Sequence, residues 1–305
     1  MLLFPDFYEI RDDRFRALIH KNAVIDTLWT GAKWCEGPAW LPASRMLVWS
    51  DIPNDMVMRW DERTGAVSVW EGPCRFQNGH TVDAQGRLVA CEHQARCVSR
   101  IEHDGSRKVL ADRFEGKRFN SPNDVVVKSD GSVWFTDPTY GIDSDYEGDN
   151  AESEIGASNV YRIGVDETVS CVVTDMVRPN GIAFSPDEAL LYVADTGTTH
   201  DQSCAPKIRA YPVDGDALGP GRTVCESSYG LFDGFRVDTG GHIWSSAGDG
   251  VHCFAPDGKL LGKILFPEVV SNLTFGGRRA NRLFITGKTC LYAIYVNATG
   301  CTPWQ

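Results

Sequence analysis

The sequence lacks several patterns that would place it in a common protein class. It has no long block of like charges and no low-complexity tract, which argues against a disordered or fibrous chain. No apolar run is long enough to cross a membrane as a helix. Lysine and arginine number 30 against 41 aspartates and glutamates, giving a net charge of −11. Since nucleic acids and anionic membranes are bound by clustered basic residues, a small molecule or a metal ion is the expected partner.

Two chemical motifs and one targeting signal are also missing. The ten cysteines include no C-x-x-C pair and mostly lie in apolar runs such as "SCVV", so we expect buried free thiols, with the disulfides of a secreted protein as the alternative. The absence of G-x-S-x-G disfavours a serine nucleophile. The start, "MLLFPDFYEI", has no basic leader and meets Pro5 early. We therefore expect an unprocessed, cytoplasmic chain, with the periplasm as the alternative.

The sequence does contain one pattern repeated six times. Each copy begins with an oxygen-bearing polar side chain, continues with strand-forming residues, turns at Gly, Pro, Asp or Asn, and resumes with a second strand. The copies are "EGPAWLPASRMLVWSD", "NGHTVDAQGRLVACE", "NDVVVKSDGSVWFTD", "NGIAFSPDEALLYVAD", "DGFRVDTGGHIWSSA" and "NLTFGGRRANRLFIT". Successive copies start 39 to 57 residues apart, and such a period built from short strands is typical of β-propeller blades. The sequence therefore predicts an all-β fold, a six-bladed β-propeller.

The segments between these hairpins supply the outer strands of each blade. "MVMRWDERTGAVSVW" and "VHCFAPDGKLLGKILF", for example, both fold back at a turn containing Gly or Asp. The sixth blade is one strand short, and "AVIDTLW" at residues 23 to 29 can complete it by pairing with the last strand, which closes the ring. We thus expect a single catalytic propeller domain over residues 23–305 and an N-terminal extension over 1–22, with a short helix in "DRFRALIH". Trp40, Trp49, Trp134 and Trp244 are expected to pack between blades.

The first residue of each hairpin has a special place in a propeller. Any single Asn-Gly or Asp-Gly is usually a turn. Here six such residues stand at the same position of the repeat, each at the start of an inner strand. In a propeller they would meet around the central channel. These positions are Glu36, Asn78, Asn123, Asn180, Asp233 and Asn272. In the third copy Ser121 and Pro122 would turn the chain so that Asn123 faces the axis, and Val125–Val127 would then be buried on both faces.

A ring of carboxylate and amide oxygens suits a hard divalent cation. We expect one such ion in the channel, Ca²⁺ first, with Mg²⁺, Mn²⁺ and Zn²⁺ as alternatives, although zinc sites usually include imidazole or thiolate. A cation left open on one side is a Lewis acid. Attack on a lactone carbonyl creates an oxyanion that it could stabilise, while a carboxylate takes the proton of the attacking water. From the residues alone, Glu36 and Asp233 are equal candidates for that base.

Four motifs in order, "EGPAW", "SPNDVVV", "RPNGIAFSPD" and "DGFRVD", resemble the senescence-marker-protein/gluconolactonase (regucalcin-like) family, over about residues 29 to 300. The bacterial gluconolactonase branch is the most similar. The resemblance implies a six-bladed propeller that hydrolyses sugar lactones with one divalent metal. It places the metal ligands on Glu36, Asn123, Asn180 and Asp233, and it makes Asp233 the general base. Ser121 stands where animal members carry a substrate-binding arginine, so the sugar must be held differently.

Further residues are candidates for contacting the substrate. They are Asn78, His80, Ser121, Asp137 and Tyr140. His80 and His93 are more often structural when they stand alone. The acidic loop, residues 137 to 157, carries seven acidic and no basic side chains and is either a solvated surface loop or part of a lid.

Three functions remain open at this point. The first is hydrolysis of glucono-1,5-lactone or a related aldonolactone. The second is hydrolysis of phosphotriesters or fluorophosphates, and the third is a non-enzymatic propeller with a structural ion. Two carboxylates facing one channel favour an enzyme, because a scaffold does not need them.

Overall fold

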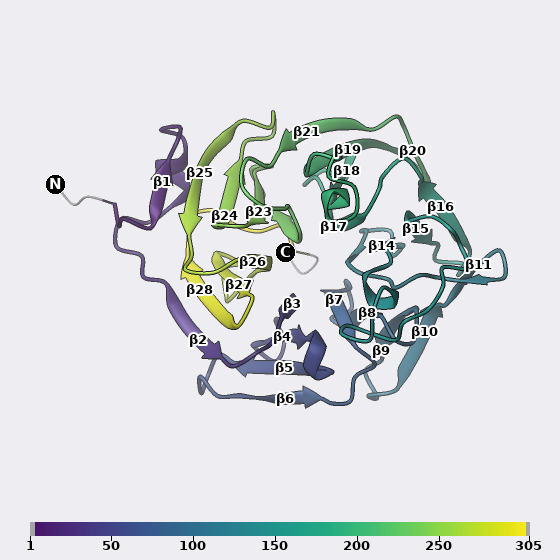
Figure 1. Ribbon diagram of the computed structural model, residues 1–305. Helices are drawn as coiled ribbons and strands as arrows, with labels where there is room; N and C mark the ends of the chain where they lie inside the picture. Colours follow the sequence, from purple (N-terminus) through teal and green to yellow (C-terminus); the bar gives the residue numbers. More distant parts are fainter. Residues whose placement is uncertain (1–3, 303–305) are drawn as a thin grey trace.

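The computed structural model describes residues 4–302, in which six antiparallel sheets of four or five strands are arranged as blades around a central channel (Figure 1). This confirms the predicted six-bladed β-propeller. In the first four blades the inner strand comes first along the chain and the outer strands follow. Within residues 4–302 no helix is both long enough and apolar enough to cross a membrane.

The blades are numbered in chain order, and their strands are given from the channel outward. Blade 1 contains β3 (Cys35–Leu41), β4 (Met46–Asp51), β5 (Met56–Asp61) and β6 (Val67–Glu71). Blade 2 contains β7 (Gln77–Val82), β8 (Leu88–Glu92), β9 (Cys97–Ile101) and β10 (Arg107–Ala111). Blade 3 contains β13 (Val125–Val127), β14 (Val133–Asp137), β15 (Asn159–Ile163) and β16 (Val169–Val173).

The last three blades carry the additions to this pattern. Blade 4 contains β17 (Pro179–Phe184), β18 (Leu190–Asp195), β19 (Lys207–Asp214) and β21 (Arg222–Glu226), with β20 (Ala217–Leu218) beside β19. Blade 5 contains β22 (Phe235–Val237), β23 (Ile243–Ala247), β24 (Gly250–Phe254), β25 (Leu260–Leu265) and β1 (Tyr8–Ile10). Blade 6 contains β26 (Val270–Gly276), β27 (Arg282–Gly287), β28 (Cys290–Tyr295) and β2 (Asp26–Thr30). A small hairpin, β11 (Arg113–Phe114) with β12 (Lys117–Arg118), follows blade 2.

The six predicted hairpins are the inner strand pairs of the six blades. In the third, the "SDG" turn places Gly131 at φ 91°, and its amide donates to the Lys128 carbonyl at 2.9 Å. The expected burial of Val125–Val127 on both faces is wrong in part. Val125 is buried, but Val126 and Val127 are only partly so, and all three line a cavity in the channel.

The ring is closed as the sequence predicts, by a strand from the N-terminal part of the chain. β2 pairs antiparallel with β28, with Asp26 opposite Ala293. Arg282 adds an ion pair, its Nη2 lying 2.9 Å from Asp26 Oδ2. All six sheets therefore have a neighbour on each side, and closure leaves no open end of the ring.

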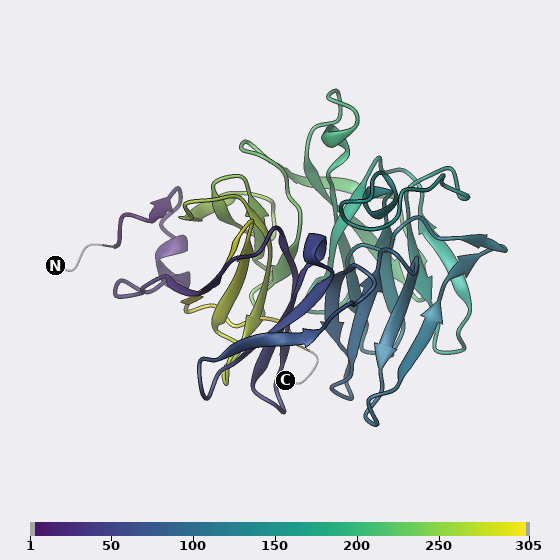
Figure 2. The same cartoon turned by 60° about the horizontal axis from the view of Figure 1, so that its bottom comes forward.

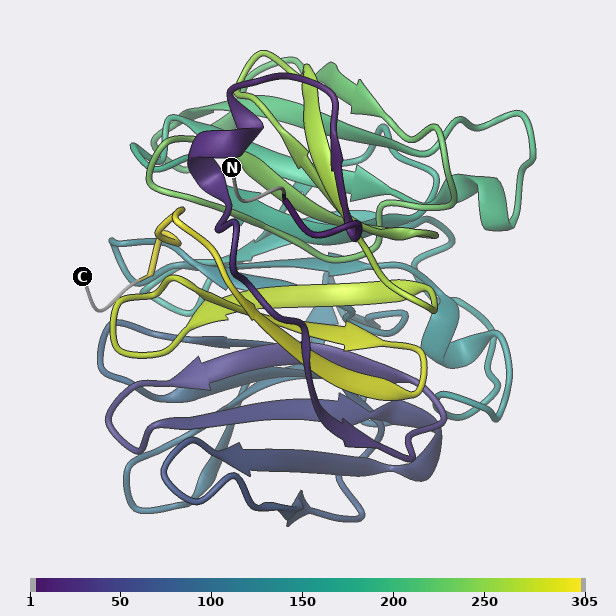
Figure 3. The same cartoon turned by 90° about the vertical axis from the view of Figure 1, so that its left-hand side faces the viewer.

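The N-terminal segment is built onto blade 5 before it reaches blade 6. The helix α1 (Phe15–Leu18) lies within the range where a helix was predicted. β1, which the sequence did not suggest, pairs with β25 and adds a fifth strand. Phe15 is fully buried against Gly262, where a Cβ would lie 2.3 Å from its ring. Figure 3 shows this segment running along the outside of the ring from blade 5 to blade 6.

Aromatic side chains join neighbouring blades, as expected for the four tryptophans. Trp40 stacks on Phe284 of blade 6, with ring centroids 5.3 Å apart. The other contacts across blade boundaries are Trp49 with Trp29, Trp134 with Phe184, and Trp244 with Phe275. All ten cysteines are free and seven are buried, which confirms the prediction of unpaired thiols.

The two ends of the channel differ. Three short 3-10 helices, η1 (Ile52–Asn54), η2 (Tyr140–Ile142) and η3 (Gly197–Thr199), follow the second strands of blades 1, 3 and 4. They project from the face where the inner strands begin (Figure 2). Thr302, the last described residue, lies at the other end, where it lines the cavity. The loops of the first face thus surround the predicted site.

Candidate active site at one end of the channel

The starts of the inner strands touch one another around the channel. The Gly79 amide donates to the Asn123 carbonyl at 2.8 Å, and the Gly181 amide donates to the Asp233 carbonyl at 3.0 Å. A Cβ added to the glycines that follow four ring residues would lie 1.9 to 2.4 Å from the next blade: Gly37, Gly79, Gly181 and Gly234. The repeated Asn-Gly and Asp-Gly pairs are therefore required for close approach between strands, and only Gly37 has a positive φ, of 51°.

Glu36 is held so that one of its oxygens stays available. Its Oε2 accepts hydrogen bonds from the Asn272 amide nitrogen at 3.0 Å and from the Gly37 backbone at 2.7 Å. Its Oε1 is buried and has no hydrogen-bond partner among residues 4–302. Both ends of the Asn272 side chain are engaged, because its Oδ1 also accepts from the Leu273 amide at 2.8 Å. Asn272 therefore orients Glu36 and is not itself a candidate ligand.

Glu36 and Asp233 lie close enough to influence each other. Burial raises the pKa of Glu36 to about 7, although the hydrogen bonds from Asn272 and Gly37 oppose the shift. Burial also raises the pKa of Asp233, and the negative charge of Glu36 is the second cause. No positively charged side chain is among the main influences on either group. A bound cation between these two carboxyls would relieve their mutual repulsion and stabilise their charged forms.

The amide side chains of the ring are held by their nitrogen atoms. Asn78 Nδ2 lies 3.2 Å from His93 Nε2, and Asn180 Nδ2 lies 3.5 Å from Thr196 Oγ1. Asn78 Oδ1 is buried without a partner among the described residues. The side chain of Asn123 makes no hydrogen bond within residues 4–302. The structure thus leaves amide oxygens available at the ring.

Three carboxylates at the ends of second strands position the residues that lead into the ring. Asp51 Oδ1 accepts from the Lys33 amide at 3.0 Å and from the Trp34 amide at 3.3 Å. Asp137 and Asp195 bind the equivalent amides in blades 3 and 4, those of Asn120, Ser121, Val177 and Arg178. Each clamp fixes the backbone two and three residues before a ring residue. The repeated final Asp of "LVWSD", "VWFTD" and "LLYVAD" is the sequence signal for this role.

The other predicted substrate contacts are distributed around the ring. Ser121 is fully buried, and its Oγ donates to the Pro138 carbonyl at 2.7 Å and accepts from the Gly141 amide at 2.9 Å. Asp137 serves as the clamp described above, and burial raises its pKa to about 7. Both residues therefore support Asn123 and the loop above it. Tyr140 is partly exposed at the rim, where its hydroxyl lies 2.7 Å from Thr196 Oγ1.

His80 lies on the far side of the ring residues. It is fully buried, with Nδ1 2.8 Å from the Gly37 carbonyl and Nε2 2.9 Å from Gln77 Oε1. It also lines the cavity at the opposite end of the channel. The structure therefore does not bring His80 together with the carboxylates of the ring.

The acidic loop contributes one residue that sequence reasoning missed. Glu147 is partly buried, and its carboxylate raises the pKa of both Glu36 and Asp233. Its own pKa is raised to about 7 by burial and by Asp143. The loop thus reaches the mouth of the site. Irregular loops have no periodic pattern, so nothing in the sequence distinguished Glu147 from the six other acidic residues.

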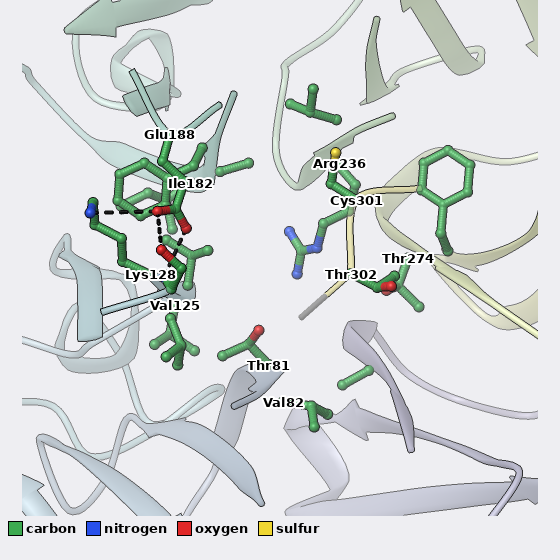
Figure 4. Close-up of a pocket in the computed structure, with 18 of the residues that line it drawn as sticks. Thr81, Val82, Val125, Lys128, Ile182, Glu188, Arg236, Thr274, Cys301 and Thr302 are labelled. Atoms are coloured by element: carbon green, nitrogen blue, oxygen red, sulfur yellow. Dashed lines mark hydrogen bonds and ion pairs between the residues drawn. The ribbon is translucent and has the colours of Figure 1, made fainter. Parts of the chain in front are cut away.

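A separate cavity of about 680 Å³ occupies the opposite half of the channel (Figure 4). It is lined by residues that follow the ring positions on all six inner strands, and its walls are mostly apolar. Arg236 projects into it, and its Nη1 lies 3.4 Å from Asp124 Oδ2, across the channel. This large cavity contains none of the ring residues, so the candidate site is assigned by chemistry and not by volume.

The donor set at the ring fits a hard cation. One oxygen of this set, Glu36 Oε1, is buried and has no partner among residues 4–302. In that part of the chain no three residues among His, Cys, Asp and Glu gather as metal ligands. The predicted set has only two carboxylates and completes its shell with amides, as oxygen-ligand sites for Ca²⁺ do. The residues present therefore suit Ca²⁺ better than zinc.

Fold and site together define a class, a six-bladed propeller with a ring of carboxylate and amide oxygens at one end of its channel. The chain belongs to the family described as SMP-30/gluconolactonase/LRE-like, whose profile matches residues 34–289. The ring residues Glu36, Asn123, Asn180 and Asp233 all lie in the matched range.

Individual relatives extend over most of the chain. The gluconolactonase of Zymomonas mobilis is 31% identical over 90% of this chain and 81% of its own. The 6-deoxy-6-sulfogluconolactonase of Pseudomonas putida is 28% identical over 87% of this chain and 92% of its own. A solved gluconolactonase structure from Xanthomonas campestris is 42% identical with a TM-score of 0.89, covering 95% of this chain and 94% of that one.

Proposed function

We propose that this chain is a hydrolase that opens sugar lactones, with glucono-1,5-lactone or a closely related aldonolactone as substrate and the aldonic acid as product. The observation that carries the proposal is the placement of Glu36 and Asp233 at the same end of the channel, where the charge of Glu36 raises the pKa of Asp233 and Glu36 Oε1 has no partner among the described residues. The family and the names of the relatives support the substrate class.

Glu36, Asn123, Asn180 and Asp233 would hold one divalent cation, with Ca²⁺ the first candidate. Such an ion, when bound, polarises the lactone carbonyl and stabilises the negative charge that develops on its oxygen. Its affinity would depend on Asn272, because that amide fixes Glu36 with Oε1 free.

Asp233 acts as the general base. It takes a proton from the water that attacks the lactone carbonyl carbon, and the proton passes to the ring oxygen when the carbon–oxygen bond breaks. Glu36 is less suited to this task, because two hydrogen bonds hold its Oε2 and orient it as a fixed ligand. A cytoplasmic location is part of the proposal and is supported by the ten unbonded cysteines.

The test is base uptake during hydrolysis, measured above the spontaneous rate, with glucono-1,5-lactone and with a phosphotriester. We expect turnover of the lactone, loss of turnover after treatment with a chelator, and recovery on adding Ca²⁺. Activity that survives full chelation would overturn the metal mechanism. Turnover of the triester alone would establish the rival hydrolase, and turnover of neither would favour a binding propeller.

A further inference from the structure

His93 connects the ring to the acidic loop. It is fully buried, and its two ring nitrogens have different partners: Nδ1 lies 2.9 Å from the Glu147 carbonyl and Nε2 lies 3.2 Å from Asn78 Nδ2. The loop also packs directly on the imidazole, since a Cβ added to Gly141 would lie 2.5 Å from it. His93 is therefore confined between a ring residue and the loop above the site.

The direction of both hydrogen bonds follows from chemistry. A backbone carbonyl can only accept, so Nδ1 must carry the proton and donate to Glu147. Nε2 of the neutral imidazole then has no proton and accepts from the Asn78 amide nitrogen. Turning the Asn78 amide over would place its oxygen against the bare Nε2 and lose this bond. His93 therefore fixes Asn78 Oδ1 on the side away from itself.

Asn78 Oδ1, so oriented, is an acceptor without a donor. It is buried, and no residue among 4–302 donates to it. Leaving a buried acceptor unpaired is unfavourable, so such an atom is expected where a ligand supplies the missing donor. A hydroxyl group is a suitable donor, and a polyhydroxylated lactone ring carries several.

We propose that Asn78 Oδ1 accepts a hydrogen bond from a hydroxyl of the lactone and that His93 is the positioning residue that directs it there. This inference rests on the proposed function and adds a determinant of substrate choice. A site that hydrogen-bonds a substrate hydroxyl discriminates strongly against an analogue that lacks it, because its own polar group is then left unpaired. His93 and Asn78 thus favour lactones that carry ring hydroxyl groups over lactones that lack them.

Two substitutions separate the roles of the two nitrogens. The side chain in His93→Gln can place an oxygen near the site of Nε2 and keep an acceptor for Asn78. The shorter side chain in His93→Asn can reach only the site of Nδ1, so it keeps the contact with the loop and loses the hydrogen bond to Asn78. The substrates are glucono-1,5-lactone and δ-valerolactone, which has the same ring without hydroxyls.

We expect His93→Asn to raise KM for glucono-1,5-lactone at least tenfold, with kcat within threefold of wild type. The loss in kcat/KM should be at least tenfold smaller for δ-valerolactone, and His93→Gln should recover most of the loss. Asn78→Leu should give the same selectivity change, and adding His93→Asn to it should cause no further loss. Glu152→Gln, in the same loop and exposed, is the control.

Calcium titration by calorimetry gives a second measurement on the same variants. Unchanged Ca²⁺ affinity in His93→Asn and Asn78→Leu supports a role toward the substrate. Affinity that falls in parallel with activity would make Asn78 an ion ligand and overturn the inference. Equal losses on both lactones would also overturn it. A wild-type protein that turns over neither lactone would instead refute the proposed function.

Discussion

The side-chain amide of Asn272 donates to Glu36 Oε2 at 3.0 Å, joining two residues that lie 236 positions apart in the sequence. This bond crosses the junction between blade 6 and blade 1. It leaves Glu36 Oε1 without a partner among residues 4–302 and so links the closure of the ring to the geometry of the site.

The two ring carboxylates should respond differently to loss of charge. Asp233→Asn should lower kcat by about 10²–10⁴-fold, because the general base is removed. Glu36→Gln should mainly weaken Ca²⁺ binding. The glutamine side chain carries no charge, and it has one acceptor oxygen where glutamate has two. Steady-state kinetics over a range of Ca²⁺ concentrations separates the two effects. Recovery of Asp233→Asn to wild-type turnover at high Ca²⁺ would contradict its role as base.

Gly79→Ala should disrupt the contact between blades 2 and 3. The added Cβ would lie 2.4 Å from the Asn123 carbonyl, and the neighbouring backbone cannot move without displacing a proposed ligand. We expect a loss of stability of about 1–3 kcal/mol, as overpacking of a close contact usually costs, together with weaker Ca²⁺ binding. Urea unfolding and calorimetry measure the two effects. Gly219→Ala, where the nearest atoms are 3.4 Å away, is the matched control and should behave as wild type.

Trp40→Ala should destabilise the junction between blades 1 and 6. Trp40 is almost fully buried and stacks on Phe284, so its removal leaves a large cavity and should cost about 3–5 kcal/mol. Trp70, which is 36% exposed, provides the control. Its replacement by alanine should cost less than a third as much in the same urea titration. Equal losses would show that the junction does not depend on Trp40.

His80 should make the protein less stable as the pH is lowered. Burial lowers its pKa from 6.5 to about 4 in the folded protein. Between these values the unfolded chain binds a proton that the folded chain does not, so the free energy of unfolding decreases as the pH falls through this window. The contribution of one such group is up to about 1.4 kcal/mol per pH unit.

His80→Gln should reduce this pH dependence. Urea unfolding between pH 4.5 and 7, in the presence of a chelator to remove the contribution of metal, gives the slope for each variant. Replacement of the exposed His103 by Gln is the control and should leave the slope as in wild type. A slope unchanged in His80→Gln would mean that the histidine is already charged in the folded state.

The sequence predicted the blades and the ring because both follow from a repeated pattern. Glu36, Asn123, Asn180 and Asp233 hold the same position in copies of one hairpin, and equivalent positions in a propeller meet at the axis. Asp137 shows a limit of this reasoning. Its place beside the site suggested a substrate contact, whereas both its oxygens hold backbone amides, a role visible only when the ends of three second strands are compared.

The loops and the N-terminal strand could not be predicted in the same way. β1 is three residues long and has no alternating pattern, and it forms because β25 offers an unpaired edge. Glu147 and His93 meet through a long irregular loop whose path depends on tertiary contacts such as Gly141 on the imidazole. Local propensity carries no information about such contacts.

The closing strand has a consequence for how the protein is made. β2 is synthesised among the first thirty residues, but its partner β28 ends at Tyr295. Until that partner leaves the ribosome, the first blade has no neighbour on one side, and Glu36 lacks the hydrogen bond from Asn272. The protein would therefore become active only after the sixth blade has been synthesised. A translation product that stops before that blade would be inactive.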